Sequence, residues 1–182
     1  MSTPAERACL DALRDAAGER DGPMERHGIR VFVIVERLAR DDGLELDREV
    51  LLCASLLHDV GLYPRASEGG AYVTDGRHYA AGILAPGRWS GDRLERCLDA
   101  IELHHELRPQ WERGAEVELV RRADLVEVSA GLVRFGLRGG WLRGLFRAVP
   151  RAGFYPEIGR LLGRALRERP ATLPQIFVVA GA

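Results

Sequence analysis

The sequence predicts an all-α, single-domain helical bundle that spans residues 1–182. Apolar residues recur with the helical period in nearly every segment, and few stretches alternate with the period of two that is typical of strands. Breaks rich in glycine and proline separate segments of helix length. A chain of 182 residues is the size of one domain and can bury a core of useful size.

Three helices are expected in the first third of the chain. The first two cover about residues 4–18 and 23–40, and His27 falls within the apolar stripe of the second. The third begins with Asp47 as N-cap and is apolar on nearly every side, which predicts that it is the central buried helix. Gly61 follows this helix closely and is predicted to be its C′ glycine.

Four further helices are expected after a loop over residues 62–74. They cover about residues 75–85, 90–108, 115–135 and 155–169. The first of the four carries His78, and the second places His105 on its apolar face with His104 at the edge of that face. Asp124 lies on the apolar face of the third. The apolar tail over residues 172–182 is expected to pack on the core or to contact a partner, which leaves a homodimer open.

The composition excludes several functions. All 26 basic residues are arginine, so no lysine is present to form a Schiff base, a P-loop or a kinase-type ATP site. The net charge of −1 argues against nucleic-acid or membrane partners, and neither a signal peptide nor a membrane span is expected. Cys9, Cys53 and Cys97 are scattered, which disfavours a disulfide framework and favours the reducing cytoplasm.

Several helices carry ionisable residues in, or at the end of, their apolar stripes. These residues are His27, His58, Asp59, His104, His105 and Asp124. Burying an imidazole or a carboxylate costs several kcal/mol unless the group is paired or bound to a metal. Groups of this kind on separate helices require a common partner, and a divalent cation fits because imidazole and carboxylate are its usual ligands.

The pattern of His27, then the pair His58-Asp59 within LLHDVG, then Asp124 resembles the HD superfamily of metal-dependent hydrolases. The resemblance covers roughly residues 20–140, with a C-terminal helical extension over about 141–182. It implies an HD-type helical bundle in which these four residues hold an iron, manganese, zinc or magnesium ion. No organic cofactor is implied.

With the further histidines included, the order of candidate ligands resembles the dinuclear branches of the superfamily. These branches are the HD-GYP phosphodiesterases and the mixed-valent di-iron oxygenases. This resemblance implies that Asp59 bridges two ions and that the second ion is held by His78 together with His104 or His105. The HHE at 104–106 is similar to the HD-GYP motif, but LRPQ follows it and no GYP appears.

A second resemblance is to the cyanamide hydratase-like group, whose H-x-x-R-V-F helix is matched by His27, Arg30, Val31 and Phe32. Many HD phosphohydrolases have a lysine shortly after the HD pair, and Leu62 occupies that place here. Phosphoryl chemistry would therefore have to use arginine. Weaker candidates to line the site are Tyr63, Arg65, Glu106, Arg108 and Arg113.

The expected function is that of a metal-dependent hydrolase, in which metal-activated water attacks a small anionic or phosphorylated substrate. The predicted catalytic residues are Asp59, His105 as an acid or base, and Arg30, which either faces the metal cavity and orients the substrate or forms a surface salt bridge. Three alternatives stay open. They are a di-iron oxygenase that cleaves a C–C or C–P bond, a cyanamide hydratase-like lyase, and a non-enzymatic HD sensor module.

Overall fold

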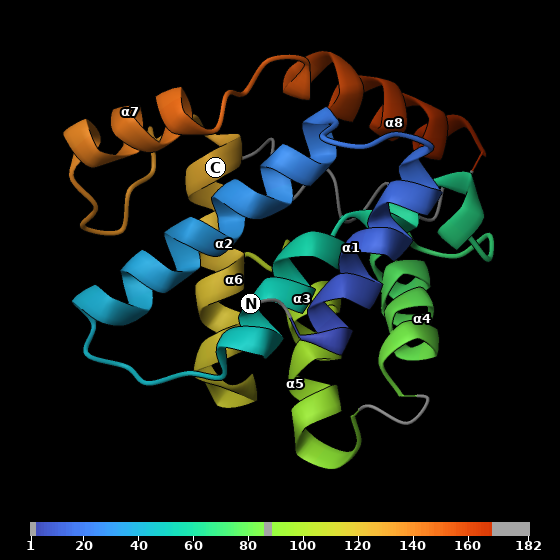
Figure 1. The fold of residues 1–182 in the computed structure, drawn as a ribbon, viewed down its shortest axis with the longest axis horizontal. Helices are drawn as coiled ribbons and strands as arrows, with labels where there is room; N and C mark the ends of the chain where they lie inside the picture. Colours follow the sequence, from blue (N-terminus) through green and yellow to red (C-terminus); the bar gives the residue numbers. More distant parts are fainter. Residues whose placement is uncertain (1–2, 86–88, 169–182) are drawn as a thin grey trace.

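Helix α3 (Arg48–Leu57) runs through the middle of the bundle, and α1, α2, α5 and α6 pack around it (Figure 1). The computed structural model describes residues 3–85 and 89–168, and these residues contain helices but no strand, which confirms the all-α prediction. The surrounding elements are α1 (Pro4–Ala17), α2 (Pro23–Asp41), η1 (Val60–Leu62), η2 (Pro64–Ala66), α4 (Tyr72–Leu84), α5 (Gly91–Glu102), η3 (Trp111–Arg113), α6 (Ala115–Val128), α7 (Gly139–Ala148) and α8 (Phe154–Glu168).

The first helices begin where the sequence provides N-terminal caps. Thr3 and Glu6 form a reciprocal capping box at the start of α1, and a proline occupies the first turn of both α1 and α2. The carboxylate of Asp47 accepts hydrogen bonds from the backbone N–H groups of Glu49 and Val50, which confirms Asp47 as the N-cap of α3.

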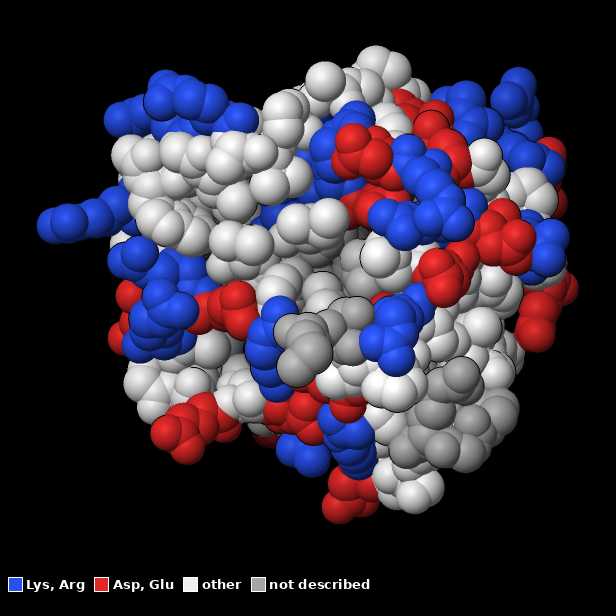
Figure 2. All heavy atoms as spheres, viewed as in Figure 1, with Lys and Arg blue, Asp and Glu red and all other residues white. Residues whose placement is uncertain are grey.

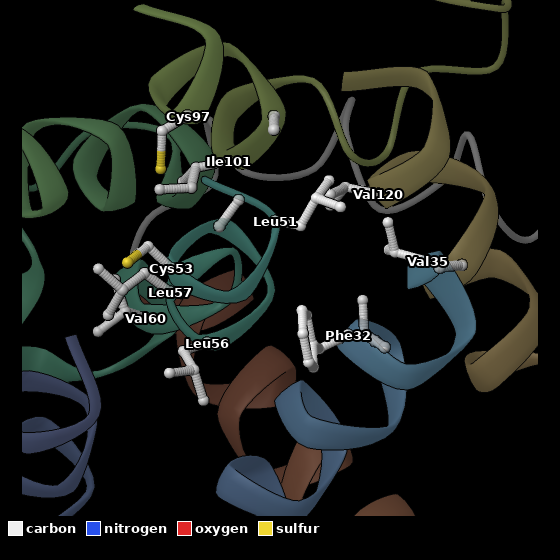
Figure 3. Packing of buried hydrophobic residues seen from close by; sticks show 14 of the residues in the cluster. Phe32, Val35, Leu51, Cys53, Leu56, Leu57, Val60, Cys97, Ile101 and Val120 are labelled. Carbon is white, nitrogen blue, oxygen red and sulfur yellow. The ribbon is translucent and has the colours of Figure 1, made fainter. Parts of the chain in front are cut away.

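The core is built on the apolar faces of α3. Val50, Cys53 and Leu57 are fully buried, and Figure 3 shows side chains of α2, α5 and α6 around this helix. Burying a side chain of this size stabilises the fold by about 1.5–3 kcal/mol relative to leaving it in water. The prediction that this is the central buried helix is therefore confirmed.

Gly61 does not have the role that the sequence predicted. Helix α3 ends at Leu57, and the chain continues through His58 and Asp59 into η1, where Gly61 does not adopt a positive φ. A Cβ on Gly61 would lie only 1.9 Å from the backbone oxygen of Tyr72. The glycine is required because the first turn of α4 packs directly on η1, and not because it caps α3.

Several predicted boundaries are also corrected. Helix α4 begins at Tyr72 instead of about residue 75, and α5 ends at Glu102, so that His104 and His105 lie in the turn after it. Helix α6 ends at Val128 instead of about residue 135. The reason is a Schellman-type cap, in which the N–H of Gly131 donates to the carbonyl of Val126 and that of Ala130 donates to Glu127.

The last described helix, α8, lies beside the N-terminal half of α2. Helix α8 packs on α2 and η1 and buries Phe154, Leu161 and Ala165 (Figure 1). The predicted apolar tail over residues 172–182 lies outside the described residues. None of the described helices is both long and apolar enough to cross a membrane. Figure 2 shows arginine and acidic side chains interspersed over much of one face.

Candidate metal centre

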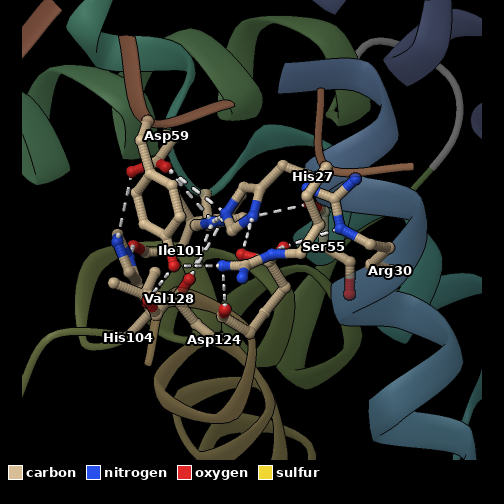
Figure 4. A network of polar contacts seen from close by, with 12 residues as sticks. His27, Arg30, Ser55, Asp59, Ile101, His104, Asp124 and Val128 are labelled. Carbon is tan, nitrogen blue, oxygen red and sulfur yellow. Dashed lines mark hydrogen bonds and ion pairs between the residues drawn. The ribbon is translucent and has the colours of Figure 1, made fainter. Parts of the chain in front are cut away.

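Four parts of the chain bring histidine and aspartate side chains together in the interior (Figure 4). Helix α2 provides His27, the turn after α3 provides the pair His58-Asp59, the turn after α5 provides His104, and α6 provides Asp124. All five residues are buried, and Asp59 is the most exposed of them at 7%.

The close approach of α2 to α3 brings the first two histidines together. Gly28 follows His27 on α2, and a Cβ there would lie 2.7 Å from the backbone oxygen of Ser55. Because only glycine fits without a shift, the two helices can approach until the Nε2 atoms of His27 and His58 are 2.9 Å apart. The two imidazole rings therefore face one point from different helices.

The outer ring nitrogens of His27, His58 and His104 are each held by an acceptor, which fixes the tautomer of the neutral ring. His58 Nδ1 donates to the carbonyl of Ser55 at 2.9 Å, and His104 Nδ1 donates to the carbonyl of Ile101 at 2.6 Å. Both carbonyls belong to the last turn of a helix, where no backbone N–H is available to them. His27 Nδ1 donates to the carboxylate of Glu127 at 2.8 Å. When each of these three rings is neutral, its Nε2 lone pair therefore points into the site.

The spacing of the inner atoms fits one metal ion. Asp124 Oδ1 lies 3.3 Å from His27 Nε2 and 3.6 Å from His58 Nε2, and Asp59 Oδ2 lies 3.6 and 3.4 Å from the same two atoms. Two ligands of one ion, each about 2.1 Å from it, are separated by about 3.0 Å at right angles and about 3.4 Å at tetrahedral angles. Asp59 Oδ1 and Asp124 Oδ1 are buried without a hydrogen-bond partner.

The electric field of the site favours positive charge. Burial opposes protonation of His58, but Asp59 and Asp124 outweigh this effect and raise its pKa well above the ordinary value. Burial likewise opposes ionisation of Asp59, but His58 and His104 hold its pKa well below the ordinary value. The carboxylates that stabilise an imidazolium would also stabilise a metal cation at the same point.

A second group of ligand atoms adjoins the first. Asp59 Oδ1 lies 3.5 Å from His104 Nε2, whereas Oδ2 of the same carboxylate faces His27 and His58. His104, His105 and Asp124 also offer ligand atoms within 4.8 Å of one another. Burial and the neighbouring His104 lower the pKa of His105 to about 4, so that this ring is neutral at pH 7.

Two residues that the sequence did not indicate complete the site. The hydroxyl of Tyr72 lies 3.4 Å from His104 Nε2, and this tyrosine is fully buried at the start of α4. Glu127 holds His27 and lies three residues after Asp124, on the same face of α6. This i, i+3 spacing of two acids on a helix with an apolar face was the signal that could have revealed Glu127.

Arg30 has a different role from both of the predicted ones. Its side chain is fully buried, and Nε donates to Glu127 Oε1 at 2.6 Å while Nη1 donates to the carbonyl of Pro150 at 2.9 Å. It is thus neither a surface salt bridge nor a partner of the ligand atoms. Arg30 supports Glu127, which in turn supports His27.

His78 is not brought to the site. It lies on an exposed face of α4, where 54% of its side chain is accessible and Nδ1 pairs with Glu68 at 2.8 Å. It belongs to none of the three ligand groups found among the described residues. The weaker candidates Arg65 and Arg113 form ion pairs with Asp15 and Asp99.

The arrangement of histidines and aspartates agrees with a comparison against known families. The model of the HD domain matches residues 24–129. The chain belongs to the HD domain family. The resemblance seen in the sequence is therefore confirmed at the level of the superfamily. No curated protein matches the chain.

Membership of the HD domain family gives the site a general chemical meaning. HD domains bind divalent metals and are largely metal-dependent phosphohydrolases, which supports an enzymatic function in general. The three ligand groups could hold such a metal. Every residue of these groups lies within the matched range 24–129.

Proposed function

We propose that this HD-domain protein is a metal-dependent hydrolase that acts on a small anionic, phosphorylated substrate. The observation that carries the proposal is the convergence of three Nε2 lone pairs and two carboxylates in one buried volume, with each outer nitrogen already bonded. A buried set of acceptors without a donor is costly, so this arrangement is adapted to a cation.

His27, His58, Asp59 and Asp124 would hold the first ion, and His104 with the other oxygen of Asp59 would hold a second. The orientation of Asp59 supports two ions, because one oxygen faces His27 and His58 and the other faces His104. When bound, divalent ions supply a lowered pKa for water and positive charge for a phosphoryl oxygen.

The protein's own groups do the remaining work. Glu127 and the carbonyls of Ser55 and Ile101 keep the rings in one tautomer and orientation. His105 is neutral at pH 7 and half-buried, so it can accept a proton at a ring nitrogen when the attacking water loses one. The hydroxyl of Tyr72 can donate a hydrogen bond beside His104.

A di-iron oxygenase is the second candidate. Two observations favour it: the two oxygens of the Asp59 carboxylate face different histidines and would each hold an ion, and the chain has no lysine to bind phosphate. Arg30 does not provide a substitute, because it is bound to Glu127 and Pro150.

Metal analysis of the full chain, purified without chelator, tests the proposal. We expect bound Mn, Fe, Zn or Mg, release of phosphate from generic phosphoesters, and loss of both in His58→Ala. His78→Ala is the matched control, because this exposed histidine should leave the metal content unchanged.

Three results would contradict the proposal. Two irons with a mixed-valent EPR signal and oxygen consumption would support the oxygenase. A single zinc ion without phosphatase activity would indicate a cyanamide hydratase-like lyase. A chain that binds no metal, and whose His58→Ala variant changes only stability, would be a sensor module.

A further inference from the structure

We propose that the connection between α7 and α8 is part of the metal centre and that Arg151 is a positioning residue for the ligand His27. This connection lies beyond residue 129, where the match to the HD domain ends. Two of its residues, Pro150 and Arg151, reach the site from there, together with Phe154 at the start of α8. The inference rests on the proposed metal-binding function.

Arg151 binds Glu127 at two points. Its Nε donates to the carboxylate atom Oε1 at 3.0 Å, and its Nη2 donates to the backbone carbonyl of the same residue at 2.6 Å. A planar guanidinium that holds the main chain and the side chain of one residue restricts the rotation of that side chain. Arg151 therefore fixes the direction in which the Glu127 carboxylate points.

The two oxygens of the Glu127 carboxylate accept hydrogen bonds from different partners. Oε1 accepts hydrogen bonds from Arg151 at 3.0 Å and from Arg30 at 2.6 Å, and Oε2 accepts from His27 Nδ1 at 2.8 Å. Because two guanidinium groups occupy Oε1, Oε2 is left for the histidine. A hydrogen bond to the outer nitrogen of a metal-binding histidine fixes the ring and raises its strength as a ligand.

Phe154 holds the other side of the same ring. It is 1% exposed and stacks on His27 with a centroid distance of 4.5 Å and an interplanar angle of 20°. The guanidinium groups of Arg30 and Arg151 lie 5.6 and 5.7 Å from the centroid of Phe154. The connection acts through Glu127 in the plane of the His27 ring, and the first residue of α8 packs across its face.

Tyr155 anchors the arginine from outside. Its hydroxyl accepts a hydrogen bond from Arg151 Nη2 at 2.7 Å and donates one to the carbonyl of Val128 at 3.1 Å. The competing explanation is that Arg151 only fastens the connection to α6 and has no effect on the metal ligand. Arg147 provides a matched control, because it is exposed, lies four residues earlier and makes no ion pair with any described residue.

The test is a double-mutant cycle that measures Zn²⁺ affinity of the full chain by competition with a chelator. We expect Arg151→Gln to weaken Zn²⁺ binding by up to about tenfold, because it loosens Glu127 but leaves this direct partner of His27 in place. Loss of a direct partner of a ligand histidine typically costs about 10–100-fold. Arg151→Lys should recover part of this loss, and Arg147→Gln should bind like the wild type. In a Glu127→Gln background, Arg151→Gln should change affinity less than about twofold, because it acts through Glu127.

Three outcomes would overturn the inference. If the wild type binds Zn²⁺ and Arg151→Gln binds it equally well, the inference fails and the proposed function stands. If Arg151→Gln weakens binding by the same factor in both backgrounds, the arginine has only a general structural role. If the wild type binds no metal, the proposed function and the inference fail together.

A second variant covers the case in which Arg151→Gln does not fold. Tyr155→Phe removes one anchoring partner of Arg151 from a side chain that is 51% exposed, so the fold should tolerate it. We expect a smaller decrease in Zn²⁺ affinity in the same direction. Affinity equal to that of the wild type would count against the inference.

Discussion

Replacement of Gly61 by alanine should destabilise the protein strongly, although it adds a single methyl group. The new Cβ would lie 1.9 Å from the oxygen of Tyr72 and 2.6 Å from the nitrogen of Gly76, and real Cβ atoms essentially never approach closer than 3.0 Å. Both contacts are to backbone, so η1 and the first turn of α4 would have to separate by more than about 1 Å.

These contacts set the free-energy cost of the substitution. Overpacking a dense interior costs about 1–3 kcal/mol, and this site belongs at the upper end because no flexible side chain can move aside. Alanine also lowers the conformational entropy of the unfolded chain, which offsets about 0.4–1 kcal/mol of this cost. We therefore expect the free energy of unfolding to fall by about 2 kcal/mol or more.

Urea denaturation in the presence of chelator measures this loss without a contribution from bound metal. Gly82→Ala is the matched control, because Gly82 lies inside the same helix, α4, and a Cβ there would meet nothing within 4 Å. This control should gain about 0.5–1 kcal/mol of helix propensity. Wild-type stability in Gly61→Ala would refute the idea that the close approach requires glycine.

Three further predictions concern Glu127, the bound metal and the N-cap Asp47. Glu127→Gln should weaken Zn²⁺ binding by about 10–100-fold in a chelator competition, and it should lower the free energy of unfolding because the buried Arg30 loses its carboxylate partner. Chelator should lower the Tm of the wild type in calorimetry, since a ligand at 100 times its Kd adds about 2.7 kcal/mol. The hydrogen bond from Arg93 holds the pKa of Asp47 below its ordinary value, so this carboxylate stabilises the fold above about pH 4 and the effect is lost as the pH falls through the folded-state value. Asp47→Asn should therefore be less stable than the wild type in denaturation at pH 6, and the difference should shrink below about pH 4.

The sequence predicted which polar groups converge better than it predicted the shape of the site. Periodicity identified His27 and Asp124 as polar groups on apolar faces, and the structure brings both of them to the centre. His78 had the same residue type but no apolar face to place it, and it lies in solvent. Whether the surrounding helix face is buried, and not the residue type, determines which of these side chains reaches the site.

The hydrogen bonds that hold Glu127 in place come from distant segments and could not be predicted from local patterns. The partners of Glu127 come from α2 and from the connection after α7, and no spacing rule links elements so far apart. Arg30 illustrates the difficulty, since the sequence suggested either a substrate contact or a surface ion pair. In the structure, Arg30 is instead buried against the carboxylate of Glu127, which belongs to another helix.

The ends of two helices explain why the rings of His58 and His104 point into the candidate metal centre. Each residue lies just after a helix ends, and each ring donates back to the carbonyl three residues earlier. The carbonyls of Ser55 and Ile101 would otherwise lack partners, so the same hydrogen bond satisfies the helix terminus and orients the histidine. Had α5 continued to residue 108 as the sequence suggested, the carbonyl of Ile101 would have been bonded within the helix and would not have been free to hold the ring. The early end of α5 at Glu102 therefore allows the ring of His104 to be held in the candidate metal centre.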